Sequence, residues 1–178
     1  MDIVKLCLDQ GASKAEEIPV SGLVFVPELR ELCEKNSCGC FGRNYTCPPL
    51  VGEVSVLIER LKTFKRAFIW QNIYKLEDSF DFEGMTEAHR KHNEQTFKIS
   101  RQIYKEIGRE NCVILAAGGC TLCETCGAIT KEPCRDPDNA LASLEAYGIF
   151  VSKIEEVSGL KYINGVNTVT YFSGAFLM

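Results

Sequence analysis

The chain has 178 residues, of which 46% are hydrophobic and 25% are charged, and its 24 acidic and 20 basic residues give a formal net charge of -4. This size and composition predict one soluble domain, residues 1–178, whose core is large enough to fold without disulfides. The mild acidity and the lack of a Lys/Arg cluster argue against a nucleic-acid partner, and no apolar run approaches the roughly 18 residues of a membrane span. The N-terminal segment lacks the pattern of a secretory signal, which predicts a reducing, cytoplasmic environment.

The first half of the chain predicts short elements around a cysteine-rich loop. The β-branched stretch 18–26 predicts a strand, and Pro27 suits the first position of a short helix that runs into the loop. After the loop, apolar residues recur with the spacing of an amphipathic helix: Val54, Leu57, Ile58 and Leu61. Residues 67–73 then predict a strand.

The second half predicts longer elements around a second cysteine-rich loop. The segment 85–108 has a helical pattern that ends at a glycine, and 112–117 is wholly apolar, as in a strand buried on both faces. A helix is expected over 136–148 and strands over 149–151 and 168–177. The interleaved order predicts an α+β or α/β sandwich, with a four- to five-stranded mixed sheet and helices.

Eight of the ten cysteines lie in the two loops, 33–49 and 119–135. They are Cys33, Cys38, Cys40 and Cys47 in the first loop, and Cys120, Cys123, Cys126 and Cys134 in the second. In a reducing compartment such clusters indicate metal binding rather than disulfides. Two loops of four thiols match two four-ligand metal sites.

The second loop has the more specific spacing, C-x2-C-x2-C with a fourth cysteine seven residues later. Three thiols at three-residue steps can surround the corners of a [4Fe–4S] cubane, whereas zinc sites more often use two separate C-x2-C pairs. Gly118, Gly119 and Gly127 let the backbone approach such a bulky group. The loop therefore predicts an iron–sulfur cluster, with zinc or no metal as alternatives.

The first loop has the less specific spacing C-x4-C-x-C-x6-C. Its last cysteine, Cys47, precedes Pro48, as does the cysteine that completes a remote cluster in two-cluster ferredoxins. Two pairings are therefore open: each loop holds its own cluster, or the loops exchange Cys47 and Cys134. The remaining alternative is a flexible loop with free thiols.

The two loops together resemble a known family, the domain-of-unknown-function family 2284 of predicted metal-binding proteins. The resemblance lies in the segment CEKNSCGCFGRNYTCPP with Gly52, and in a second block from Gly119 to Ile149. It implies cysteine-bound metal, as an iron–sulfur centre, in proteins typical of anaerobic bacteria and archaea, and it assigns no reaction. Cys40 departs from the family pattern, and without it the first loop offers three thiolates and leaves one iron open.

Four further residues are candidates for the surroundings of the centres. His89 and His92 share a helical face, where packing near the helix start is the simpler interpretation. Arg135 follows a proposed ligand and would stabilise the reduced form of a cluster. Glu145 is either a group near the metal or a surface acid.

Three functions remain open from the sequence. The favoured one is a cytoplasmic iron–sulfur protein with one or two [4Fe–4S] clusters that transfers electrons or supports the redox chemistry of a partner enzyme, because no nucleotide-binding or hydrolase motif is present. The alternatives are an enzyme whose open iron acts as a Lewis acid on a small-molecule substrate, and a zinc-stapled interaction module. The oligomeric state is left open.

Overall fold

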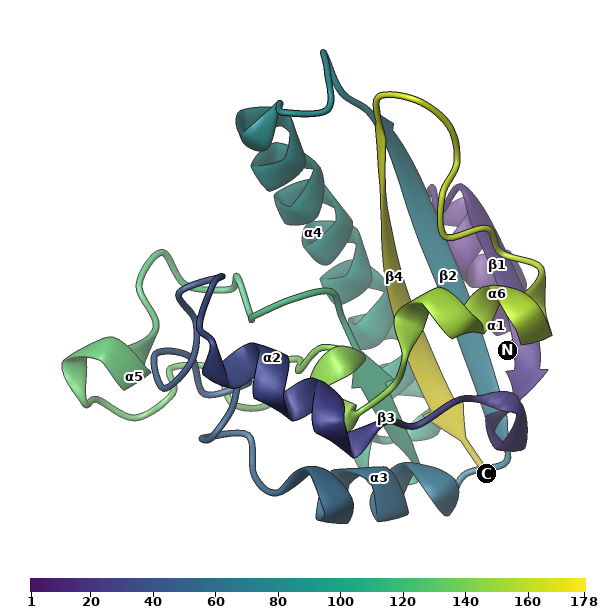
Figure 1. Ribbon diagram of the computed structural model, residues 1–178. Helices are drawn as coiled ribbons and strands as arrows, with labels where there is room; N and C mark the ends of the chain where they lie inside the picture. The colour runs from purple at the N-terminus through teal and green to yellow at the C-terminus, as the bar shows by residue number, and fades with distance from the viewer.

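A four-stranded sheet forms the centre of the computed structural model, which describes residues 1–178 (Figure 1). The strand order is β1-β2-β4-β3, and the strands are β1 (Lys14–Pro19), β2 (Arg66–Lys75), β3 (Cys112–Leu115) and β4 (Thr168–Leu177). All three strand pairings are antiparallel, and the one parallel pairing is the isolated bridge between Ala116 and Ser143. The α+β class is thereby confirmed, and the parallel part of the expected mixed sheet is limited to this bridge.

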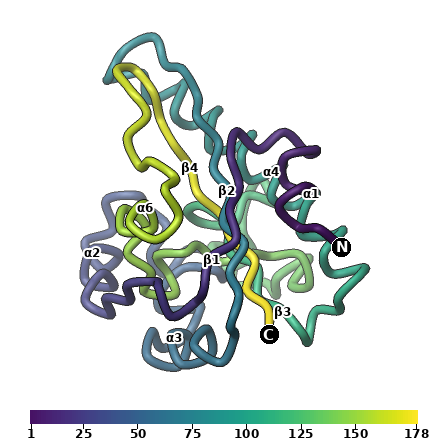
Figure 2. The backbone as a smooth tube through the Cα atoms, turned by 90° about the vertical axis from the view of Figure 1, so that its right-hand side faces the viewer, coloured from purple at the N-terminus to yellow at the C-terminus, as the bar shows by residue number.

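Helices cover both faces of the sheet. They are α1 (Ile3–Asp9), α2 (Arg30–Glu34), α3 (Val54–Lys62), α4 (Phe82–Ile107), α5 (Gly127–Thr130) and α6 (Ile154–Ser158). Figure 2 shows α1 and α4 on one side of the sheet and α2, α3 and α6 on the other. None of these helices is both long enough and apolar enough to cross a bilayer.

Two hydrophobic cores result, because side chains alternate across a strand. On β2, Ile69 packs into the core with Leu61 of α3, whereas Trp70 packs into the core with Ile99 of α4. All four side chains are fully buried. Burial of a side chain of this size contributes roughly 1.5–3 kcal/mol, so the two cores fix the sheet from which the cysteine loops extend.

The most periodic segments form the predicted elements. The apolar spacing at 54–61 lies in α3, and β4 spans the predicted residues 168–177. The expected helix 85–108 is confirmed by α4, which ends at Gly108 with a φ of 88°. This left-handed backbone region suits glycine, since it has no Cβ. The expected strand 112–117 is confirmed over 112–115.

Three predictions in less periodic segments are wrong or incomplete. Residues 136–148 form turns and a single 3-10 turn, Glu145–Tyr147, instead of a helix. The reason is tertiary pairing: Ala116 N–H donates to the carbonyl of Ala142, and the carbonyl of Ala116 accepts from Leu144 N–H. These bonds remove the groups of Ala142 and Leu144 from any helix. The segment 149–151 is not a strand, and of the expected strand 18–26 only the first two residues lie in β1.

Candidate metal centres

The two cysteine loops, far apart in sequence, lie against each other. Asn44 donates to the carbonyl of Cys120 (3.0 Å), and Cys120 N–H donates to Thr46 Oγ1 (3.0 Å). Further along, the Tyr45 hydroxyl donates to the carbonyl of Glu132 (2.7 Å). Three consecutive residues of the first loop therefore hold the second loop in place, and the two candidate centres are neighbours.

The thiols of the first loop surround a cavity of about 410 Å³. Cys33, from α2, lines it together with Cys38 and Cys47. Cys40 is not among the lining residues, and its Sγ donates to the carbonyl of Cys38 at 3.7 Å. The cavity thus has three thiols on its wall and far more space than a single metal ion needs.

Two glycines complete the wall beside these thiols. A Cβ at Gly119 would lie 3.2 Å from Cys47 Sγ and 3.4 Å from Cys40 Sγ, and a Cβ at Gly118 would lie 2.8 Å from His89 Nε2. Any larger residue would push into the sulfurs or the imidazole. These glycines were expected to serve the second loop, and the structure places them at the first instead, because the chain after β3 passes between the loops.

His89 also lines the cavity, whereas His92 is part of the core. The Nε2 atom of His89 lies 2.7 Å from the carbonyl oxygen of Ala117 and 3.1 Å from the amide nitrogen of Asn93, so this side of the ring is held by the protein. His92 bonds to Asn72 and Ser173 inside the core, where burial lowers its pKa to about 3. The packing interpretation therefore suits His92 and not His89.

Glu145 lies on the cavity wall within the 3-10 turn. Its side chain is exposed toward the open space of the cavity, and desolvation by the surrounding protein raises its pKa, with His89 acting in the opposite direction. Tyr162, Tyr171 and Phe172 add aromatic rings to the same wall. No sequence motif marks these three residues, since they reach the cavity only through the path of β4 and the loop before it.

The four thiols of the second loop line one common space: Cys120, Cys123, Cys126 and Cys134. The space is about 20 Å³, room for about one water molecule, so a cluster requires the loop to widen. The loop projects from the sheet together with α5 (Figure 1), and only its first part, Cys120 and Leu122, packs against the core with α4. At Gly127 a Cβ would lie 2.6 Å from the carbonyl oxygen of Glu132, which shows how tightly the loop turns.

The thiols in each loop disfavour one another's ionisation. Burial, and then the charges of Cys40, Cys38 and Cys33, raise the pKa of Cys47 to about 12. Burial likewise raises the pKa of Cys120, with Cys134 and Cys123 adding to the effect. Such thiols are protonated at neutral pH without metal, so metal binding must release their protons.

No group of three or more His, Cys, Asp or Glu side chains is arranged around one point as ligands of a single metal ion would be. Ligands of a cubane bond to different iron atoms and need not converge in that way. The donor set, all thiols, is the set that iron–sulfur clusters use. The residues of both loops therefore fit a cluster.

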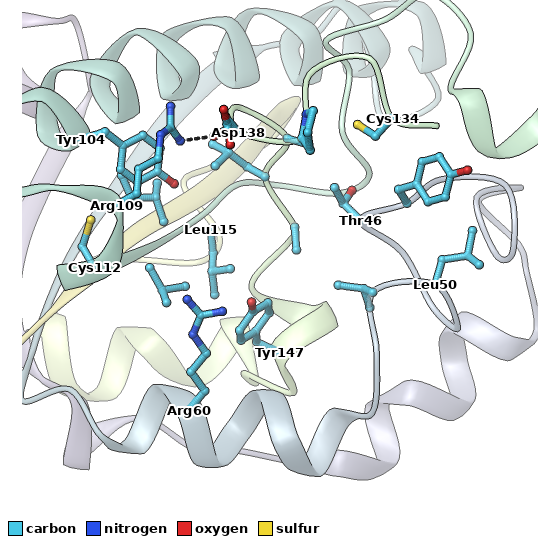
Figure 3. Close-up of a pocket in the computed structure, with 18 residues that line it drawn as sticks. Thr46, Leu50, Arg60, Tyr104, Arg109, Cys112, Leu115, Cys134, Asp138 and Tyr147 are labelled. Atoms are coloured by element: carbon cyan, nitrogen blue, oxygen red, sulfur yellow. Dashed lines mark hydrogen bonds between the residues drawn. The ribbon is translucent and has the colours of Figure 1, made fainter. Parts of the chain in front are cut away.

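A third cavity, of about 420 Å³, lies beside the second loop (Figure 3). Thr46 and Cys134 line both this cavity and the space among the second loop's thiols. Arg60, from α3, and Arg109 add positive charge; Arg109 stacks over Tyr104 at 4.1 Å. Cys134 can therefore be approached from this open side.

Arg135 lines the space among the second loop's thiols, and Cys112 lines the third cavity. Arg135 donates to the carbonyl of Thr125 (3.3 Å) and pairs with Glu132 (3.4 Å), so it spans the second loop. Cys7 and Cys112 are buried in the core with α4 and take no part in either loop.

Comparison with known proteins agrees with the thiol geometry. The family described as "Predicted metal-binding protein (DUF2284)" matches residues 16–177. The chain belongs to this family. The DUF2284 match contains both cysteine loops and all four strands except the first two residues of β1. Neither the curated proteins nor the solved structures contain a match to the chain.

Proposed function

We propose that this DUF2284 protein is an iron–sulfur protein with two adjacent [4Fe–4S] centres, which transfers electrons or supports the redox chemistry of a partner enzyme. The observation that carries the proposal is the sorting of the thiols: three of the first loop line one cavity, and all four of the second loop line another space. When bound, the clusters would supply one-electron redox chemistry. The protein's residues supply the thiolates, the space that glycines without a Cβ leave beside them, and surroundings that are partly shielded from solvent.

The contact between the loops supports electron transfer in particular. The hydrogen bonds from Asn44 and Tyr45 to the second loop fix the distance between the two centres. With both clusters bound, Cys134 would hold the second one beside the open cavity shown in Figure 3, and the residues of the two loops would hold the clusters side by side. A redox partner would bind at this side of the molecule.

Replacement of a second-loop cysteine tests the proposal. Cys123→Ala should remove about half of the iron and the spectral signature of one centre, because the cubane loses a corner ligand. Cys7→Ala is the matched control, since Cys7 is a buried thiol outside both loops and should leave the iron content unchanged. Full iron content in Cys123→Ala would contradict the assignment.

A second candidate is favoured by the position of Cys40. Since Cys40 does not line the cavity with the other three thiols, one iron of the first centre would lack a thiolate and face a cavity large enough for a small molecule. An open metal position with adjacent polar groups is how metals act as Lewis acids on substrates. Addition of cyanide should then perturb the spectrum of the first centre only, and no response would count against this enzyme.

A further inference from the structure

The cavity of the first loop has an unbalanced charge. Among its lining residues are three thiols, one carboxylate, that of Glu145, and one imidazole, that of His89, and there is no lysine or arginine. Arg30, whose positive charge acts on Cys33, donates its guanidinium to the carbonyls of Gly52 and Ala146, each at 2.9 Å. A carboxylate or phosphate ligand would meet the carboxylate of Glu145 there, with no lysine or arginine on the wall of the cavity to pair with.

Aromatic rings also line the wall of the first-loop cavity. The rings of Tyr162 and Phe172 lie nearly parallel, with centroids 6.1 Å apart and an interplanar angle of 18°. Tyr171 donates its hydroxyl to the carbonyl of Met85 (3.0 Å), which fixes its ring beside His89, 5.4 Å away between centroids. Ring faces carry negative potential and attract cations, most strongly in partly desolvated sites.

We propose that this cavity binds a small organic cation, an amine or a methylated ammonium, between the carboxylate of Glu145 and the rings of Tyr162, Tyr171 and Phe172. The lining of the cavity supports this, since no lysine or arginine lies among the residues that line it with Glu145, and a bound cation would pair with this carboxylate. The imidazole of His89 lies on the same wall and adds a polar contact for a ligand with an N–H group. The cation would lie beside the thiols of the first loop. That it would also lie next to an open iron rests on the second function proposed above, but the existence of the cation site does not.

Three probes of similar bulk and different charge test the inference: tetramethylammonium, tert-butanol and pivalate. Binding is measured by calorimetry on the anaerobically prepared full chain, at constant ionic strength, after its iron and sulfide have been determined. We expect tetramethylammonium to bind at least about tenfold more tightly than tert-butanol, and pivalate to bind more weakly than either. Pivalate binding as tight as that of tetramethylammonium would overturn the proposal.

Matched variants assign the binding to the cavity. Glu145→Gln should weaken tetramethylammonium binding about tenfold and leave the affinity for tert-butanol unchanged. Tyr162→Leu should also weaken the binding of tetramethylammonium. Glu156→Gln is the control, because Glu156 is an exposed acid on α6 that pairs with Lys153 outside the cavity. Unchanged tetramethylammonium affinity in Glu145→Gln would contradict the site.

A spectrum recorded during the titration separates this inference from the proposed chemistry. If tetramethylammonium binding depends on Glu145 and cyanide does not change the spectrum, the cation site is supported and the open iron is rejected. A cyanide response together with loss of cation selectivity rejects the cation site and retains the open iron. The two proposals therefore fail through different results.

Discussion

Cys40 differs from the other first-loop thiols in what its sulfur contacts. Its Sγ lies against the carbonyl of Cys38 and beside Gly119, whereas the other three line the cavity. Burial, and then the charge of Cys38, raise the pKa of Cys40, whose thiol also interacts with that of Cys47. The sequence predicted this difference in two ways. Cys38 and Cys40 are separated by a single residue and could bond two irons only with a tight bend at Gly39, and the resemblance does not call for Cys40.

Two serine substitutions should separate the thiols that lie two residues apart. Cys40→Ser is expected to retain the iron and the spectral signature of the first centre, and Cys38→Ser to lose both, because only Cys38 lines the cavity. Iron analysis and electron paramagnetic resonance of the anaerobic proteins measure the outcome. Loss of the first centre in Cys40→Ser would make Cys40 a ligand and close the open site.

His92 makes stability depend on pH. Its folded-state pKa of about 3 lies below the unfolded value of about 6.5, so the unfolded chain binds more protons between these values. The free energy of unfolding should therefore fall as the pH drops below about 6.5, by up to about 1.4 kcal/mol per pH unit. In His92→Gln this contribution disappears, and anaerobic urea denaturation of both proteins between about pH 7 and pH 5 measures the difference in slope. Equal slopes would show that His92 does not titrate on unfolding.

At the scale of elements, the hydrophobic periodicity predicted those helices and strands whose backbone is not determined by tertiary contacts. The apolar spacings of α3 and α4 and the β-branched run of β4 each bury one or both faces, so the pattern and the core agree. The segment 136–148 has helix-start residues, yet pairing with Ala116 determines its backbone. Helix α1 was not predicted, although Asp2, which accepts from Lys5 N–H, is an N-cap signal.

The pairing of the loops is an element-scale property that the sequence left open. The cysteine spacing allowed Cys47 and Cys134 to be exchanged between the centres, because each is the last cysteine of its loop. In the structure Cys47 lines the cavity with Cys33 and Cys38, and Cys134 lines the other space with Cys120 and its neighbours. We therefore expect each loop to hold its own centre.

Two further variants test that pairing. Cys47→Ser should resemble Cys38→Ser, with loss of the first centre only, and Cys134→Ser should resemble Cys123→Ala, with loss of the second only. Iron content and low-temperature paramagnetic resonance of the four anaerobic proteins are compared. If Cys134→Ser instead shared the spectrum of Cys38→Ser, the loops would exchange these ligands.

At the scale of the whole molecule, a sheet with a core on each face carries two adjoining thiol loops at one end. The sequence predicted the sheet class and the two loops. It could not predict their contact, since Asn44, Tyr45 and Thr46 are ordinary polar residues until the fold brings residues 120–132 to them. The same holds for the cavity, whose wall combines α2, α4, the segment after β3 and β4.

The central claim is that thiolates of this DUF2284 protein bind iron–sulfur clusters, and its most direct test is metal and acid-labile sulfide analysis of protein purified without oxygen. We expect brown protein with iron and inorganic sulfide in equal amounts, about eight of each per chain if both loops hold a [4Fe–4S] centre. Stoichiometric zinc without sulfide, in colourless protein, would contradict the account and leave a zinc-stapled module in its place.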